Sequence, residues 1–369
     1  MRYRLVASLM LLCLAVRAQE ITTRDVKTTI ELLTRGLTLE QQGDGSWNYP
    51  AYPVGCTALC LLALKQAGLS NRHPAVARAT TYVNKATDGK VYSEALVAVA
   101  LAEVDPERYE RRIKRAGGFL EVAQTDGGGW GYDDRKTRWD NSNTQFAALG
   151  LAAVERCGFR VAPQVKERAR QHWLKQQKGD GTWGYSGSSS ATTSMTLAGL
   201  ASLNLLGVKH ERKQRACGEY EYNPVMYKPL RWISKRMDRG TPANALAGGR
   251  TFYSLYALER VGIFLGLKEI GGIDWYRWGA AWVCRQELAK RSLTQRALAL
   301  LFLAKADADV AIAKWKWDGD WNNQHQDVDR WCSLASNALD ARLDWVVAEP
   351  DRLDSPAARA SLIFVHGPT

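Results

Sequence analysis

Most of the chain alternates between two kinds of predicted helix. In the first kind the apolar residues share one face, as in Thr28–Gln42, where Leu33 and Leu37 lie one helical turn apart. The second kind is apolar nearly all round, as in Val54–Gly68. A helix with one apolar stripe can face water, whereas a helix that is apolar on every side must be buried. The alternation therefore predicts outer amphipathic helices and inner buried helices in strict succession.

Six such outer–inner pairs follow one another. They are Thr28–Gln42 with Val54–Gly68, His73–Ala86 with Tyr92–Val104, Pro106–Gln124 with Asn143–Gly158, Pro163–Gln177 with Thr192–Gly207, Asn223–Met237 with Thr251–Gly266, and Asp274–Leu288 with Thr294–Asp307. Two concentric rings satisfy this alternation best, so the predicted fold class is all-α, an α6/α6 toroid. We find no alternating strand pattern before about residue 340 and expect no sheet within the toroid.

One short motif recurs between the helices of three pairs, at Gln41–Tyr49, Gln124–Tyr132 and Gln176–Tyr185. Each copy combines a Gln, an Asp-Gly pair and a Trp, which makes it an internal repeat. Asp-Gly suits a tight reversal, and the Trp supplies a large apolar anchor. We therefore expect the three tryptophans to be buried and structural: Trp47, Trp130 and Trp183.

The Gln, Asp-Gly, Trp turn followed by an apolar helix resembles the QW repeats of squalene–hopene cyclases. It is also similar to the prenyltransferase/squalene-oxidase repeats of protein prenyltransferase β-subunits. The resemblance covers about residues 28–307 and is clear in three units. It implies a toroid whose central cavity holds an apolar, isoprenoid-like ligand, and it gives the turns themselves no catalytic role.

The resemblance also implies an acid, because those cyclases protonate an alkene through a D-x-D-D box. This chain has no such box, and the nearest matches are Asp133-Asp134 and Asp318-Gly319-Asp320. Adjacent carboxylates can raise one another's pKa, as a general acid requires. The weak catalytic candidates are therefore Asp133, Asp134 and Asp140, although a carboxylate pair in an exposed loop is more often simply solvated.

No metal or other cofactor is expected. Protein prenyltransferases hold Zn²⁺ through an Asp, a Cys and a His, but none of the five histidines lies in an inner helix near the other two. His325 and Asp327–Cys332 have suitable residue types and lie beyond the toroid. The segment Cys217–Tyr220 is similar to the thioester motif of complement-like proteins, yet Tyr220 replaces the required Gln, so we expect a free thiol.

The expected binding site is the mouth of the toroid, where the inner helices begin. Polar groups that converge on an apolar hollow are the default binding site. The candidate ligand-binding residues at these helix starts are Tyr92, Glu94, Asn143, Thr192 and Tyr253. The loop Gly131–Ser142 leads into this mouth, where Asp140 or Ser142 could alternatively cap the helix that follows.

Charge and the N-terminal segment bear on partners and location. The formal net charge is +12, and Arg2, Arg4 and Arg17 contribute three of these charges, so cleavage would leave +9. Basic residues are scattered and not interleaved with aromatic residues, so no nucleic-acid partner is expected. Residues 1–18 have the pattern of a signal peptide. Their apolar run Leu5–Val16 has 12 residues, too few to span a bilayer, so we expect export to the periplasm or medium.

The tail differs from the toroid. We divide the chain into a signal peptide (1–18), a toroid (19–307) and a tail (308–369) that begins a further α/β domain. Leu343–Ala348 and Ser361–Val365 are expected to be strands, paired in parallel through a crossover over Pro350–Arg359. A similar sequence follows toroid repeats in some exported bacterial proteins, and this chain would carry only the start of that domain.

Three classes of function compete. The favoured one is an exported toroid that binds an apolar, polyprenyl-like or peptide ligand, or a protein partner, without cyclase or Zn-prenyltransferase chemistry. The first alternative is an isoprenoid cyclase or transferase with a divergent acid site. The second is a carbohydrate-active α6/α6 enzyme, which would need two inward carboxylates. Only Glu94 and Asp140 qualify for that role among the inner-helix starts.

Overall fold

The computed structural model describes residues 21–216, 219–246, 250–306, 310–316, 328, 331–332, 335, 343–348 and 362–364. The expected signal peptide, the thiol of Cys217, the Asp318-Gly319-Asp320 sequence and most of the His325–Cys332 segment lie outside these residues. None of the described helices combines the length and the apolar character needed to cross a membrane.

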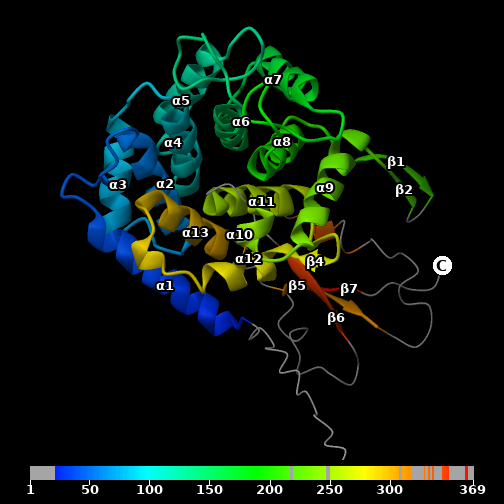
Figure 1. Ribbon diagram of the computed structural model, residues 1–369. Coiled ribbons are helices and arrows are strands. Elements are labelled where there is room, and N and C mark those ends of the chain that lie inside the picture. The colour runs from blue at the N-terminus through cyan, green and yellow to red at the C-terminus, as the bar shows by residue number, and fades with distance from the viewer. Residues whose placement is uncertain are drawn as a thin grey trace, which may run out of the picture.

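Twelve helices form the two rings seen in Figure 1. The outer helices are α1 (Thr23–Glu40), α3 (Pro74–Lys85), α5 (Glu110–Ala123), α7 (Pro163–Gln176), α9 (Pro224–Met237) and α12 (Trp275–Val283). The inner helices are α2 (Pro53–Gln66), α4 (Val91–Val104), α6 (Asn141–Arg156), α8 (Thr193–Leu205), α11 (Thr251–Leu265) and α13 (Leu293–Ala306). Each inner helix packs against the next, and α13 packs against α2 to close the ring. The predicted α6/α6 toroid is confirmed.

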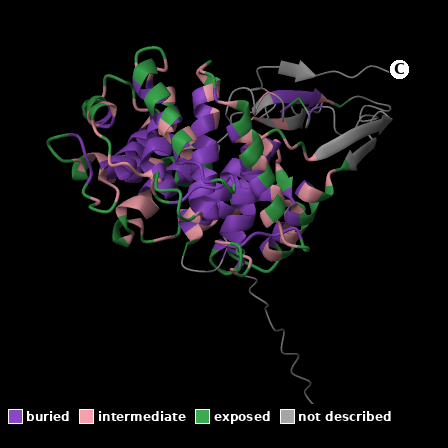
Figure 2. Ribbon diagram, turned by 90° about the horizontal axis from the view of Figure 1, so that it is seen from above, coloured by how far each residue is buried: buried purple, intermediate pink, exposed green. Residues whose placement is uncertain are grey.

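Burial separates the two rings as the sequence pattern predicts. In α1 only one stripe is buried, formed by Val26, Thr29, Leu33 and Leu37. In α4 nearly every position is buried, including the polar Ser93. Figure 2 shows the buried residues concentrated on the inner helices, while the outer helices carry most of the exposed ones. Because the inner ring is enclosed on all sides, its helices gain their stability from packing and not from one amphipathic face.

Each of the three tryptophan turns, Gln41–Trp47, Gln124–Trp130 and Gln177–Trp183, joins three helices in the same way. The Trp side chains are at most 1% exposed. Every indole N–H donates to a carbonyl ten residues earlier in its own outer helix, at 2.7 to 2.8 Å. Every Trp backbone N–H donates to a Thr hydroxyl of the following inner helix. The expected structural role of Trp47, Trp130 and Trp183 agrees with this geometry.

The glutamine of each turn reaches the next outer helix. Gln124 Nε2 donates to the Gly128 carbonyl inside the turn (3.0 Å) and to the Val165 carbonyl in the first turn of α7 (2.9 Å). Gln41 and Gln177 repeat this pair of bonds. At Gly128 φ is +84°, and a Cβ there would lie 2.2 Å from the Arg168 carbonyl oxygen. The crossing helix therefore leaves room only for glycine.

The turn between α3 and α4 contains Asp88-Gly89 but no Trp, and an ion pair occupies the corresponding place. Arg112 of α5 donates to the Val83 and Ala86 carbonyls at the end of α3, both at 3.2 Å. The same guanidinium donates to both carboxylate oxygens of Glu94, at 2.6 and 2.9 Å. Arg112 and Glu94 are 4% and 2% exposed. This buried pair ties three helices together where the other turns use tryptophan.

The sequence shows no alternating strand pattern before about residue 340, but the expectation of no sheet within the toroid was wrong, because two short strand pairs lie there. β1 (Glu211–Ala216) and β2 (Glu219–Tyr222) form an antiparallel hairpin after α8. β3 (Glu269–Ile270) and β4 (Ile273–Asp274) pair around Gly271-Gly272, which both have positive φ. The sequence of β1, ERKQRA, is polar except for Ala216 at its end, so it lacks the apolar alternation that marks a half-buried strand. Backbone hydrogen bonds between the strands define both short pairs.

In the tail, β5 (Val310–Trp315) lies between β6 (Asp344–Ala348) and β7 (Leu362–Phe364), and both pair with it in parallel. The expected strands are present, but they do not pair with each other. Ile312 and Ala313 of β5 are 3% and 1% exposed, so both faces of this strand are covered, as a central parallel strand requires. Lys268 Nζ donates to the Trp345 carbonyl at 3.0 Å, which links the sheet to the loop after α11.

Candidate functional site

Aromatic side chains gather at the end of the inner ring where the inner helices begin. The aromatic cluster comprises Tyr52, Tyr92, Tyr132, Phe146, Tyr253 and Tyr256. Phe146 of α6 is central, with its ring centroid 4.9 Å from that of Tyr92 and 6.3 Å from those of Tyr253 and Tyr256. Tyr92 continues the contacts to Tyr52 at 5.9 Å and to Tyr132 at 6.2 Å. These separations are typical of interacting aromatic pairs.

A hydrogen-bonded chain crosses the ring through two of these aromatic residues, Tyr92 and Tyr253. Around the ring, α4 and α11 stand opposite each other, because two inner helices separate them on either side. Tyr92 of α4 and Tyr253 of α11 nevertheless both hydrogen-bond Ser142 of α6, the latter at 3.3 Å. The Tyr253 hydroxyl also contacts Gln145 Oε1 at 2.6 Å. The side chains Tyr92, Ser142, Tyr253 and Gln145 therefore form one network, here called the polar chain.

The donors of the polar chain can be assigned by elimination. An amide oxygen can only accept, so the Tyr253 hydroxyl donates to Gln145 Oε1. With that hydrogen used, Ser142 donates to the Tyr253 oxygen, and Tyr92 in turn donates to Ser142. Burial raises the pKa of the Tyr92 and Tyr253 hydroxyls well above their ordinary value. Both phenols therefore keep their protons at physiological pH.

Helical spacing explains why α6 supplies the centre of the site. Ser142, Gln145 and Phe146 fall at i, i+3 and i+4, which places them on neighbouring parts of one helix face. Ser142 is 6% and Gln145 0% exposed, whereas Tyr132 at the rim is 45% exposed. The aromatic cluster is thus accessible at Tyr132, while Phe146, Tyr256 and the uncharged centre of the polar chain are buried.

Asp140 caps α6 and does not face the cluster as a free acid. Its carboxylate accepts from the Asn143 backbone N–H and from Asn143 Nδ2, both at 2.8 Å. Burial raises the pKa of Asp140, and the hydrogen bonds from Asn143 and Tyr185 oppose that rise. The capping alternative anticipated for Asp140 is what the structure shows. Thr192 caps α8 in the same manner, accepting from the Met195 N–H at 3.2 Å.

The other expected site residues lie outside the polar chain. Glu94 belongs to the buried pair with Arg112 described above. Asn143 is fully buried and bonded to Asp140. Asp133 accepts from Arg135 at 2.6 and 2.9 Å, which holds its pKa below the ordinary range, and Asp134 is exposed. Of the eight sequence candidates, the structure brings Tyr92 and Tyr253 together in the polar chain and pairs Asn143 with Asp140.

Three central residues, Ser142, Gln145 and Phe146, were missed by sequence reasoning, although a signal exists. Asp140-Asn141-Ser142-Asn143 has the spacing of D-x-D-D, with Ser and Asn at the second and third acidic positions. A search for aspartates alone passes over this match. The segment carries one carboxylate, that of Asp140, where a D-x-D-D sequence carries three.

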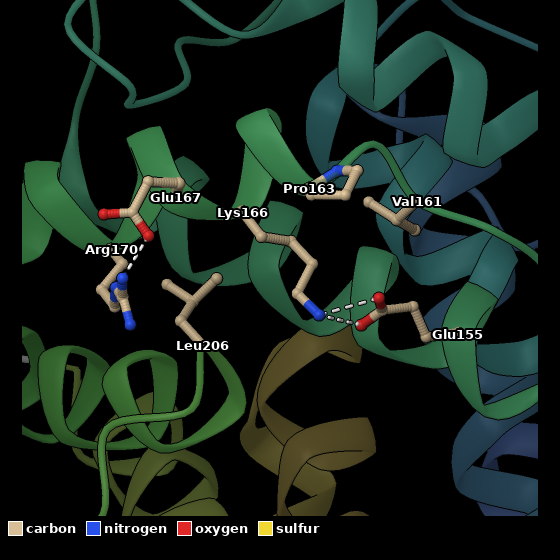
Figure 3. Close-up of a pocket in the computed structure, with 7 residues that line it drawn as sticks. All are labelled: Glu155, Val161, Pro163, Lys166, Glu167, Arg170 and Leu206. Carbon is tan, nitrogen blue, oxygen red and sulfur yellow. Dashed lines mark hydrogen bonds and ion pairs between the residues drawn. The ribbon is translucent and has the colours of Figure 1, made fainter.

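A separate hollow lies at the opposite ends of the inner helices (Figure 3). It encloses about 220 Å³ between Glu155 at the end of α6, Leu206 after α8, and α7. Lys166 Nζ pairs with Glu155 at 2.8 Å, and Arg170 pairs with Glu167. These charges balance within the hollow, so its four charged lining residues offer no unpaired charge to a ligand. Within the described part of the chain, no group of three or more His, Cys, Asp or Glu could hold a metal ion.

The described architecture is that of the α/α toroids, a class that contains enzymes with unrelated substrates. One structural neighbour is a variant of the type II terpene cyclase MstE from Scytonema in which asparagine replaces one aspartate, in complex with geranylgeranyl dihydroxybenzoate. It is 13% identical, with 76% of this chain and 97% of that chain covered and a TM-score of 0.52.

A second neighbour is an inactive variant of an alpha-1,6-mannanase from Salegentibacter sp. HEL1_6, in complex with alpha-1,6-mannotriose. It is 12% identical, with 76% and 98% of the two chains covered and a TM-score of 0.52. No family model and no curated protein sequence matches this chain. At these identities the two likenesses establish the fold alone.

Next to the site, the buried His172 of α7 makes the free energy of unfolding of the protein depend on pH. Its side chain is buried, with Nε2 3.1 Å from Asn141 Oδ1 and Nδ1 3.2 Å from the Gly127 carbonyl oxygen. Burial lowers the pKa of His172 from 6.5 to about 4. Because the unfolded chain takes up this proton first, the stabilisation is complete above pH 6.5 and is lost as the pH falls towards 4.

We expect this titration to cost about 3 kcal/mol of unfolding free energy between pH 6.5 and 4. Urea unfolding at a series of pH values measures it, with His172→Gln as the variant that cannot titrate. The variant should show a flatter pH dependence within this window. Equal slopes for the two proteins would show that His172 does not carry the effect.

Proposed function

We propose that this protein binds a ligand with an apolar, isoprenoid-like body at the aromatic cluster and does not start a reaction on it by protonation. The observation that carries the proposal is the cluster itself. Six rings from three inner helices and two preceding loops converge on one end of the ring, and a polar chain without charge links two of them. Large aromatic surfaces with a few fixed polar groups are typical of small-molecule sites.

The acid needed for cyclisation is what the site lacks. Protonating an alkene requires a carboxyl group with a free proton aimed at the substrate. Among the described residues at this end of the ring, Asp140 has both oxygens engaged by Asn143, and the D-x-D-D spacing holds Ser142 and Asn143. The hydroxyl of Ser142 and the amide of Asn143 are far too weakly acidic for that step. Binding without cyclisation therefore fits the residues better than the cyclase alternative.

The glycosidase alternative meets a similar obstacle. The mannanase neighbour was made inactive by replacing two adjacent aspartates with asparagine. The adjacent aspartates of this chain, Asp133 and Asp134, lie in the loop before α6, and Arg135 keeps the pKa of Asp133 low. A carboxylate held ionised in this way is poorly suited to protonate a leaving group at neutral pH. We therefore rank carbohydrate cleavage below apolar binding.

An isoprenoid alcohol and the ligand of the mannanase neighbour test the proposal directly. We expect calorimetry to show binding of geranylgeraniol and none of alpha-1,6-mannotriose. Chromatography with mass spectrometry should recover the first compound unchanged. Tyr92→Ala should weaken binding about tenfold, the value of one lost aromatic contact. Tyr227→Ala, on the exposed face of outer helix α9, is the matched control and should bind like the unmodified protein.

Three results would contradict the proposal. A cyclised product of unchanged mass would show that the chain is a cyclase after all. Shortened mannotriose would favour the glycosidase. Equal binding by Tyr92→Ala and Tyr227→Ala would place the ligand outside the aromatic cluster.

A further inference from the structure

We propose that the aromatic cluster selects ligands that carry an uncharged oxygen acceptor, and that the side-chain amide of Gln145 donates to this oxygen. The inference rests on the proposed function and deepens it, because it names the group that the apolar ligand carries. The expected ligand class is an isoprenoid-like molecule with a hydroxyl, carbonyl or ether oxygen.

The first observation is an unmatched donor. Gln145 is fully buried, and its Nε2 has no hydrogen-bond partner among the described residues. The other atom of the same amide, Oε1, accepts from the Tyr253 hydroxyl at 2.6 Å, which restrains the orientation of the amide. A buried amide without a partner is costly. A ligand oxygen would remove this cost, and so would gain more from the site than a hydrocarbon.

The second observation is the direction of the polar chain. Each hydroxyl hydrogen in it is already used, from Tyr92 to Ser142, from Ser142 to Tyr253, and from Tyr253 to Gln145. Within this chain, the N–H groups of Gln145 are therefore the donors left over. They can serve an acceptor on the ligand without breaking any existing bond, which is why we infer an oxygen acceptor.

The charged residues near the cluster indicate whether the ligand oxygen is neutral or belongs to an anion. The guanidinium of Arg260 lies 5.5 Å from the Tyr256 ring, and it donates to both carboxylate oxygens of Glu259. Its positive charge is therefore balanced one residue away. Arg250 is exposed and lies over Tyr185 at the rim, 5.9 Å from that ring. Among the described contacts neither guanidinium reaches Gln145, so a diphosphate or carboxylate placed against its buried amide would lose its hydration without a positive partner there.

Three twenty-carbon probes in the same detergent test the inference: geranylgeraniol, the matching hydrocarbon without the hydroxyl, and geranylgeranyl diphosphate. The unmodified protein should bind the alcohol about tenfold more tightly than the hydrocarbon, the value of one recovered buried hydrogen bond. The diphosphate should bind more weakly than the alcohol. In Gln145→Leu, which keeps the side-chain size, the alcohol should lose this advantage while the hydrocarbon binds as before.

The controls separate this inference from the proposed function. Gln171→Leu, an exposed glutamine of α7, should keep the preference for the alcohol. Should Gln145→Leu fail to fold, Gln145→Met is the second variant, and the comparison of the probes in the unmodified protein needs no variant. If no probe binds, the proposed function fails. If alcohol and hydrocarbon bind equally, if Gln145→Leu keeps the preference, or if the diphosphate binds best, apolar binding stands and the role of Gln145 is refuted.

Discussion

Replacing Trp130 by alanine should lower the free energy of unfolding by about 3–5 kcal/mol, the range for large aromatic residues in a core. Trp130 is fully buried, and its indole N–H donates to the Leu120 carbonyl at 2.7 Å. Its backbone N–H donates to Thr144 of α6 at 3.0 Å. The substitution would leave a cavity and remove the link between α5 and the turn. Thermal and urea unfolding measure the loss.

The matched control is Trp331→Ala, because the Trp331 side chain is 55% exposed. A substitution at such a surface position usually changes stability by less than about 0.5 kcal/mol. The Asp140 cap is bonded directly to the Trp130 turn, because the Asp140 backbone N–H donates to the Trp130 carbonyl at 3.0 Å. Trp130→Ala should therefore also weaken ligand binding by displacing the start of α6. Equal stability of the two variants would contradict the structural role of the turn.

The second large effect concerns the buried ion pair. Arg112→Met should cost about 3–5 kcal/mol, because it leaves the Glu94 carboxylate buried without its partner. Replacing both residues by apolar ones of similar size, as in Glu94→Leu with Arg112→Met, should restore much of that loss. A double-mutant cycle in urea measures the coupling between the two positions.

Two outcomes would oppose this account of Glu94. Purely additive losses would show that the two side chains do not act as a pair. A change in ligand binding at constant stability would return Glu94 to the binding site, where the sequence placed it. Lys166→Met provides the comparison with an exposed pair, since Lys166 and Glu155 are 34% and 35% exposed and should contribute little.

The helices could be predicted from the sequence because burial and periodicity are linked residue by residue. An inner helix such as α8 is apolar on all sides, and an outer helix such as α1 buries one stripe. Boundaries were less predictable: α5 begins at Glu110, although Pro106 suggested an earlier start. The hairpin of β1 and β2 could not be foreseen, because backbone pairing within a polar segment leaves no apolar alternation.

The site was predictable only in part. Tyr92 and Tyr253 could be proposed because both stand near inner-helix starts. Their meeting at Ser142 depends on the closure of the ring, which no local pattern encodes. The sequence indicated that Glu94 is an inward carboxylate. In the structure it pairs with Arg112, which lies 18 residues later on an outer helix. Long-range pairing of this kind follows from the fold and not from the sequence around either residue.

The central claim is that the aromatic cluster at the inner-helix starts is the ligand site. Photo-crosslinking with a geranylgeranyl probe that carries a diazirine tests it most directly, with the labelled residues mapped by mass spectrometry. We predict that label falls on Tyr92, Phe146 or Tyr253 and that excess geranylgeraniol removes it. Label confined to the hollow around Lys166, to the outer helices or to the strands of the tail would contradict the claim.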